Sequence, residues 1–145
     1  MAPNEARTRK VITRRQLNAG YSWLGNASEE EYEVAAWMEE HDYTYIYQAD
    51  FTLFSGFTTK VDFQVLGNAP PLVLFVQGDK WHQGMDQRIY DREQELAVSF
   101  TGATVVEIWG HQILQYPGFP TPTDASFDRV MALAMEGQQV GNAWS

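Results

Sequence analysis

The sequence contains no cysteine, which excludes both a disulfide framework and a zinc site with thiolate ligands. Long apolar runs are missing as well, because no window reaches the roughly 18 uninterrupted apolar residues that a membrane helix needs. The first residues are basic and polar, without the apolar stretch of a secretory signal. Together these absences predict an intracellular, cytoplasmic protein with no membrane partner.

Positive charge is scarce outside the N-terminal segment. Half of the 10 Lys and Arg residues fall in residues 1–15, which carry a charge of +4, whereas residues 16–145 hold 18 acids against five bases, a charge of −13. A body this acidic does not attract nucleic acid at long range, so the basic arm would have to supply that contact. A solubilising tail explains the arm equally well. Its bases are Arg7, Arg9, Lys10, Arg14 and Arg15.

The length of 145 residues, 44% of them hydrophobic and 14% aromatic, predicts one domain with a single core. We divide it into a basic arm over residues 1–25, a core over 26–116, and a proline-rich connection with a C-terminal helix over 117–145. That last segment is expected to pack on the same domain.

Periodicity predicts an α/β fold with the element order αβββαβα. Ser28 and Glu31 form a capping box that opens the first helix. Alternation along the predicted strand Thr58–Leu66 puts Val61, Phe63 and Val65 on one face and Asp62 on the other. The predicted helices are Glu29–His41, Met85–Phe100 and Asp124–Glu136, and the predicted strands are Tyr45–Phe51, Thr58–Leu66, Leu72–Val76 and Ala103–Trp109.

Three residues on successive elements are candidates for hydrolytic chemistry. Asp62 lies on a strand, His82 follows the end of the next strand, and Asp91 lies within the following helix. A carboxylate is a suitable ligand for a hard cation such as Mg²⁺, and an Asp beside a His fixes its tautomer and raises its basicity. Each residue also has a plainer explanation: an edge-strand acid, a surface histidine and a solvated helix position.

Two further features are ambiguous on physical grounds alone. The glutamates at the start of the first helix already complement the helix dipole, so Glu31 needs no functional explanation. Trp81 is either a core residue or a platform on which a base stacks.

These residues resemble the very short patch repair (Vsr) endonucleases of the PD-(D/E)xK nuclease superfamily. The resemblance covers roughly residues 28–113, and its most specific piece is the stretch Phe75–His82, which matches Phe-x-x-Gly-x-x-Trp-His. The other pieces are the Glu31 helix leading to Tyr45–Gln48, Val61-Asp62-Phe63, Tyr90-Asp91 with Leu96, and Gly102 with Ile108-Trp109.

The resemblance implies a restriction-endonuclease-like mixed sheet of about four to five strands with helices on both faces. It also implies a site of the Glu, Asp, variable, His, Asp type, which falls on Glu31, Asp62, Gln77, His82 and Asp91.

Several departures limit what the resemblance implies. Without cysteine, the structural zinc of the repair enzyme is absent, and Lys80 replaces an aromatic residue that this enzyme wedges into DNA. Phe75 and Gln77 replace the Glu and Lys of the general superfamily motif. The segment from His82 to Asp91 is also short, so the chain is more similar to the compact versions in phage proteins and homing endonucleases, and mismatch recognition is not implied.

The expected activity is hydrolysis of DNA phosphodiesters with Mg²⁺ or Mn²⁺. The resemblance implies that Asp62, Glu31 and the backbone carbonyl of Val76 hold the metal, and that His82 and Asp91 activate water. Trp81, Lys80 and the basic arm would contact DNA.

A different class of function is also open: a nuclease-fold adaptor subunit of a larger assembly, with weak or no activity and a protein partner at the arm or the C-terminal segment. The acidic body favours that alternative. The residues also do not distinguish DNA nicking from cleavage of RNA or of branched DNA.

Overall fold

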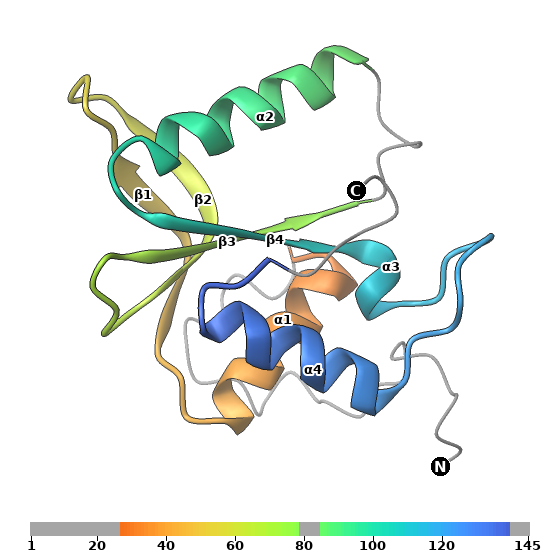
Figure 1. Cartoon of the computed structure of the whole chain (residues 1–145). Helices are drawn as coiled ribbons and strands as arrows, with labels where there is room; N and C mark the ends of the chain where they lie inside the picture. Colours follow the sequence, from red (N-terminus) through yellow and green to blue (C-terminus); the bar gives the residue numbers. More distant parts are fainter. Residues whose placement is uncertain (1–26, 79–84, 140–145) are drawn as a thin grey trace.

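The computed structural model describes residues 27–78 and 85–139 as a four-stranded mixed sheet with helices on both faces (Figure 1). The α/β class with about four to five strands is therefore confirmed. In chain order the elements are α1 Glu29–Glu40, β1 Tyr45–Thr52, β2 Thr58–Val65, β3 Leu72–Gln77, α2 Met85–Ser99, β4 Thr104–Trp109, α3 Gly110–Ile113 and α4 Asp124–Met135.

The strands are ordered β1-β2-β3-β4 across the sheet. The pairs β1–β2 and β2–β3 are antiparallel, and β3 pairs with β4 in parallel. The parallel pair needs a crossover, which α2 provides. Because β3 and β4 run the same way, their carboxyl ends, at Gln77 and Trp109, meet at one end of the sheet.

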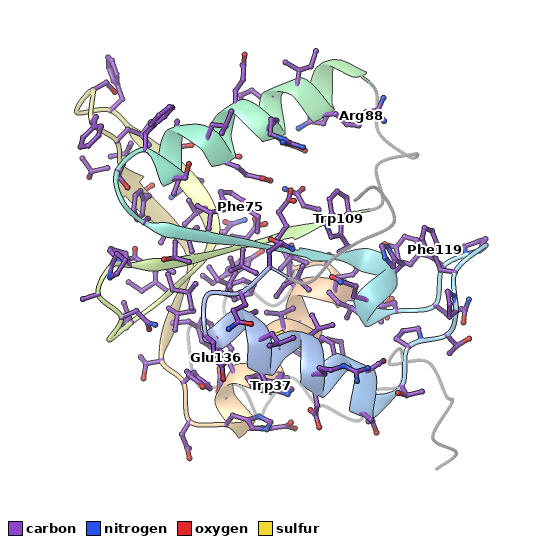
Figure 2. All side chains as sticks on the ribbon, viewed as in Figure 1. Trp37, Phe75, Arg88, Trp109, Phe119 and Glu136 are labelled. Atoms are coloured by element: carbon purple, nitrogen blue, oxygen red, sulfur yellow. The ribbon has the colours of Figure 1, made fainter. Side chains whose placement is uncertain are left out.

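Two hydrophobic clusters fill the spaces on the two faces of the sheet. The larger one joins α1 and α4 to the sheet and includes Met38, Leu74 and Phe127. The smaller one lies under α2 (Figure 1) and includes Phe75, labelled in Figure 2, and Val98. Successive β3 residues point to opposite faces, so its continuous apolar run serves both clusters, as expected of a central strand.

The β1–β2 hairpin changes layers halfway along its length. Tyr45 and Phe63 belong to the larger cluster, whereas Ala49 and Val61, in the same alternating rows, belong to the smaller one. The change occurs at Gln48, whose φ is +53°, a value uncommon for a residue other than glycine. The expectation that Val61, Phe63 and Val65 share one face is therefore wrong, because Val61 packs under α2 while the other two pack against α1 and α4.

Polar contacts fix the helices on the larger cluster. Ser28 caps α1, and its hydroxyl accepts a hydrogen bond from Glu31 N at 3.1 Å. Trp37 on α1 donates through Nε1 to Asp128 on α4 at 2.8 Å. The Tyr116 hydroxyl donates to Glu30, so the connection after α3 holds the first turn of α1.

The predicted and observed elements differ at their ends and in one helix. Most boundaries agree within a residue or two, and the cap at Ser28 is confirmed. The short helix α3 had not been expected. It forms where Gln112 Oε1 accepts the Trp109 N–H at 2.8 Å, a local contact without a long periodic signature.

The outer edge of the sheet at β4 is partly covered by a side chain. Gln139 accepts a hydrogen bond from Glu107 N at 2.7 Å and donates one to Glu107 O at 2.8 Å. Such pairing blocks an edge on which another strand could add. Across residues 27–78 and 85–139, none of the helices has the length and apolar character needed to cross a membrane.

Candidate functional site

Asp62 lies where β2 and β3 separate. The last paired residues of these strands are Phe63 and Leu74, and beyond them the β3 backbone no longer pairs with β2. There the Asp62 side chain takes the place of a β2 backbone partner, because its Oδ2 accepts a hydrogen bond from Val76 N at 2.8 Å. This contact fixes the carboxylate beside the end of β3, where the expected Val76 carbonyl ligand also lies.

The environment of Asp62 disfavours its charge. Its pKa is raised from the usual 3.8 to about 7, chiefly by burial and further by the negative charges of Glu31 and Asp91, while the Val76 hydrogen bond opposes the rise. An acid from α1 and an acid from α2 thus each lie close enough to Asp62 to repel its charge. A carboxylate with so high a pKa in a group of acids is typical of a functional site.

Glu31 has both a structural and an electrostatic role at the start of α1. Its Oε1 accepts one hydrogen bond from Ser28 N at 3.0 Å and another from the Tyr47 hydroxyl at 2.9 Å. The pKa of Tyr47 is raised, chiefly by burial and then by Glu31 and Asp62, so its hydroxyl stays protonated and donates. The helix-capping explanation of Glu31 is confirmed, and the charge of the same carboxylate acts on Asp62.

Gln77 ends β3, and α2 holds its side chain. Its Nε2 donates to Glu95 Oε2 at 2.6 Å. Glu95 had not been identified from the sequence, although it lies one helical turn after Asp91, on the same side of α2. Its position four residues from a candidate acid is the signal that would have found it.

Asp91 is the third acid of the group. Its Oδ1 accepts a hydrogen bond from Gln87 at 2.7 Å, and its charge reaches Asp62 across the space between α2 and the sheet. The expected partner His82 lies outside the described residues, as do Trp81, Lys80 and the basic arm, Arg7, Arg9, Lys10, Arg14 and Arg15. The structure therefore places Glu31 and Asp91 each near enough to Asp62 for its charge to act on that residue, with Val76 and Gln77 at the end of β3.

The chemistry of these donors fits a hard divalent cation. The acids offer oxygen ligands, and the repulsion that raises the Asp62 pKa would be relieved by a positive charge. In residues 27–78 and 85–139, no three His, Asp or Glu side chains are close enough together to hold one metal ion. Two carboxylates with a backbone carbonyl and waters remain a suitable set for Mg²⁺, which keeps several waters.

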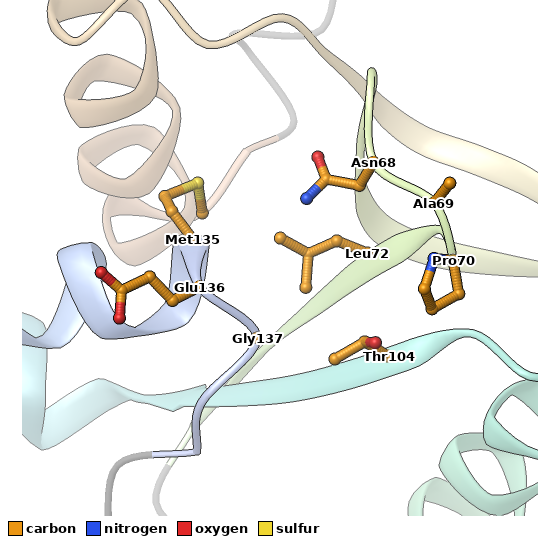
Figure 3. Close-up of a pocket in the computed structure, with 8 residues that line it drawn as sticks. All are labelled: Asn68, Ala69, Pro70, Leu72, Thr104, Met135, Glu136 and Gly137. Atoms are coloured by element: carbon orange, nitrogen blue, oxygen red, sulfur yellow. The ribbon is translucent and has the colours of Figure 1, made fainter.

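A separate cavity of about 290 Å³ lies away from this group of acids (Figure 3). It opens between the β2–β3 loop, the starts of β3 and β4, and the end of α4. Because strands β3 and β4 begin there, it is at the opposite end of them from Gln77. Its lining residues are Asn68, Ala69, Pro70, Leu72, Thr104, Met135, Glu136 and Gly137.

No family model matches the chain, and no match was found among curated proteins or solved structures.

Proposed function

We propose that the protein is a metal-dependent DNA endonuclease whose site is centred on Asp62. The observation that carries this proposal is the gathering of Glu31, Asp62 and Asp91 from three elements around the end of β3, with the Asp62 pKa raised to about 7. Acids that repel one another reduce the stability of the fold, and a bound divalent cation would remove that cost.

Each residue has a distinct role in the proposed reaction. Asp62 and Glu31, with the carbonyl of Val76, would hold Mg²⁺ or Mn²⁺. The cation would neutralise charge on the phosphate and the leaving oxygen. His82, oriented by Asp91, would take a proton from the attacking water.

Gln77 would orient a water molecule or a phosphate oxygen in this scheme. Its hydrogen bond to Glu95, at 2.6 Å, supports that role because it limits the rotation of the amide. A fixed donor costs less reorganisation in the transition state than a free one.

Cleavage of supercoiled plasmid tests the proposal. The wild-type protein should nick or linearise the plasmid with Mg²⁺ or Mn²⁺ and should be inactive in EDTA. Asp62→Asn should lose at least about 100-fold in rate, as expected when a main metal ligand is removed. The matched control is Asp50→Asn, because Asp50 lies on the neighbouring strand, is 65% exposed and pairs with Lys60 at 2.9 Å. Equal rates for wild type and Asp62→Asn would disprove the assignment.

The alternative is a nuclease-fold adaptor with little activity, favoured by the charge of −13 outside the arm. Thermal unfolding with Mn²⁺ separates the two, because a ligand that binds only the folded state raises the melting temperature. A rise in the wild type that is absent in Asp62→Asn supports the nuclease. No rise in either protein supports the adaptor.

A further inference from the structure

The proposed site holds more negative charge than one divalent cation can offset. Glu31, Asp62 and Asp91 carry three carboxylates when ionised, and Glu95 contacts Gln77 at the end of β3. Each phosphate of a DNA strand brings one more negative charge. A bound Mg²⁺ therefore leaves the site negative, so cleavage of DNA there calls for a positively charged side chain as well.

Positive side chains are scarce in the part of the chain that the structure describes. Its four Lys and Arg residues are Lys60, Arg88, Arg92 and Arg129. Three of them are exposed, and Lys60 also pairs with Asp50 at 2.9 Å. Arg88 alone is partly buried, although arginine is usually an exposed residue. Among the described bases, Arg88 is therefore the strongest candidate for the positive charge that the site needs.

The spacing along α2 places Arg88 on the side of the helix that carries the acids. Arg88 lies three residues before Asp91 and seven before Glu95. Because seven residues complete nearly two turns, Arg88 is almost in line with Glu95, and Asp91 lies about 60° away around the helix. Glu95 in turn accepts the hydrogen bond from Gln77, the last residue of β3, at 2.6 Å. Arg88 and Glu95 thus share the edge of α2 that faces the end of β3.

The position of α2 over the sheet agrees with this placement. The first half of α2 lies above the carboxyl ends of β3 and β4 (Figure 1). Arg88 is at that end of the helix, on the side toward the sheet, and Trp109, the last residue of β4, lies below it (Figure 2). Trp109 pairs with Gln77, so Arg88 is at the same end of the sheet as Val76 and Gln77.

We propose that Arg88 is a catalytic residue that binds the phosphate to be cleaved. Its planar guanidinium donates two parallel hydrogen bonds to non-bridging phosphate oxygens, a geometry that lysine does not provide. The positive charge stabilises the negative charge that builds up on these oxygens in the transition state. This inference rests on the proposed nuclease function and adds a contact with the substrate from α2.

Single-turnover cleavage of supercoiled plasmid with Mg²⁺ tests this role. Arg88→Ala should lose at least about 100-fold in rate, the usual effect of removing one donor that stabilises the transition state. Arg88→Lys keeps the charge without the planar pair of donors and should recover only part of that loss. The control is Arg129→Ala, at an exposed arginine of α4, which should cleave at the wild-type rate.

Thermal unfolding with Mn²⁺ separates the role of Arg88 from that of the metal ligands. Arg88→Ala should gain at least as much thermal stability from Mn²⁺ as the wild type, because Arg88 does not bind the metal, whereas Asp62→Asn should gain none. An active wild type with an equally active Arg88→Ala overturns the role of Arg88 and leaves the nuclease function intact. A wild type without activity overturns the nuclease function.

DNA binding with Ca²⁺ in place of Mg²⁺ tests the phosphate contact even where no cleavage occurs. Each phosphate contact contributes about 0.9 to the slope of the logarithm of the association constant against the logarithm of salt concentration. Arg88→Ala should therefore lower the magnitude of this slope by about 1, and Arg129→Ala should leave it unchanged. A slope that Arg88→Ala does not alter overturns the proposed contact.

Discussion

At the scale of single residues, Asp62 shows how a strand carboxylate acquires an unusual pKa. Its Oδ2 takes the Val76 N–H where β2 and β3 part, so the chain holds it in place even though its charged form is disfavoured there. A hydrogen bond from a backbone N–H lowers a carboxylate pKa, yet burial and two neighbouring acids outweigh that effect. The arrangement favours protonation near neutral pH unless a cation is bound.

We expect Asp62 to make the stability of the metal-free protein depend on pH. Because its pKa is about 7 in the folded state and 3.8 ordinarily, the folded state retains a proton between these values that the unfolded state has lost. Stability should therefore fall as pH rises from about 4 to about 7, by at most about 4 kcal/mol. Asp62→Asn has no such proton, and its amide oxygen can still accept the Val76 N–H.

The difference in the free energy of unfolding between Asp62→Asn and wild type should thus grow with pH and level off above about 7. Urea denaturation at several pH values, in EDTA, measures it. A difference that is constant with pH would mean that the Asp62 pKa is not raised.

Two tyrosines of β1 offer a matched pair for testing the role of Glu31. The Tyr47 hydroxyl donates to Glu31 at 2.9 Å, and the Tyr45 hydroxyl donates to Glu39, at the other end of α1, at 2.5 Å. Replacing either by Phe should cost about 1.5–3 kcal/mol, the usual contribution of a hydrogen bond to a charged group.

Only Tyr47→Phe should also slow Mn²⁺-dependent plasmid cleavage, by about 10-fold, because it frees a proposed metal ligand. Equal cleavage rates for Tyr45→Phe and Tyr47→Phe would show that Tyr47 does not position Glu31 for catalysis.

At the scale of elements, the layer change of the β1–β2 hairpin is the feature that shapes the site. Gln48, with φ of +53°, lies across from Asp62 between the paired residues Tyr47–Phe63 and Ala49–Val61. The hairpin beyond this point packs under α2, and the part before it packs on α1 and α4. Asp62 therefore lies at the boundary between the two layers, where acids from α1 and α2 can both reach it.

The positive φ of Gln48 yields a direct prediction. Gln48→Val should destabilise the protein by about 2 kcal/mol, because a β-branched residue is strained in the left-handed region. Gln48→Gly should change stability by less than about 1 kcal/mol, since glycine adopts this conformation freely but orders at a higher entropic cost. Thr52→Val, at an exposed position of the same strand, is the control and should be nearly neutral. Thermal denaturation measures all three, and a well-tolerated Gln48→Val would contradict the strain.

Local signals in the sequence predicted most elements but not the layer change. The Ser28 cap and the apolar run at Leu72 involve residues close in sequence, so pattern alone identifies them. The alternation of apolar and polar residues continues unbroken through Gln48. No local pattern therefore reveals that the apolar residues before and after Gln48 pack in different hydrophobic clusters.

The polar contacts around the candidate site and at the first turn of α1 could not be predicted from the sequence either. Gln77–Glu95, Tyr47–Glu31 and Tyr116–Glu30 join residues 18, 16 and 86 positions apart. Which donor meets which acceptor over such separations depends on how the helices pack on the sheet. Asp62 and Asp91 were identified because they lie on successive predicted elements, and Glu31 only through the family resemblance, whereas the repulsion of Asp62 by the other two appears only in the folded chain.

At the scale of the whole molecule, the separation of charge decides how the protein would meet DNA. The body carries −13 and the first 15 residues carry +4, so long-range attraction can come only from the arm or from a bound cation. An acidic body also limits non-specific association, because its net negative charge repels phosphate.

Salt dependence of DNA binding measures the contribution of the arm. With Ca²⁺ in place of Mg²⁺, to allow binding without turnover, the logarithm of the association constant should fall linearly with the logarithm of salt concentration. Because each phosphate contact contributes about 0.9 to the slope, replacing Arg7, Arg9 and Lys10 by Ala should reduce its magnitude by about 2 to 3. The control is Lys60→Ala, since Lys60 already pairs with Asp50 on the body and should leave the slope unchanged. A slope that the triple variant does not alter would identify the arm as a solubilising tail and remove it from the DNA-binding surface.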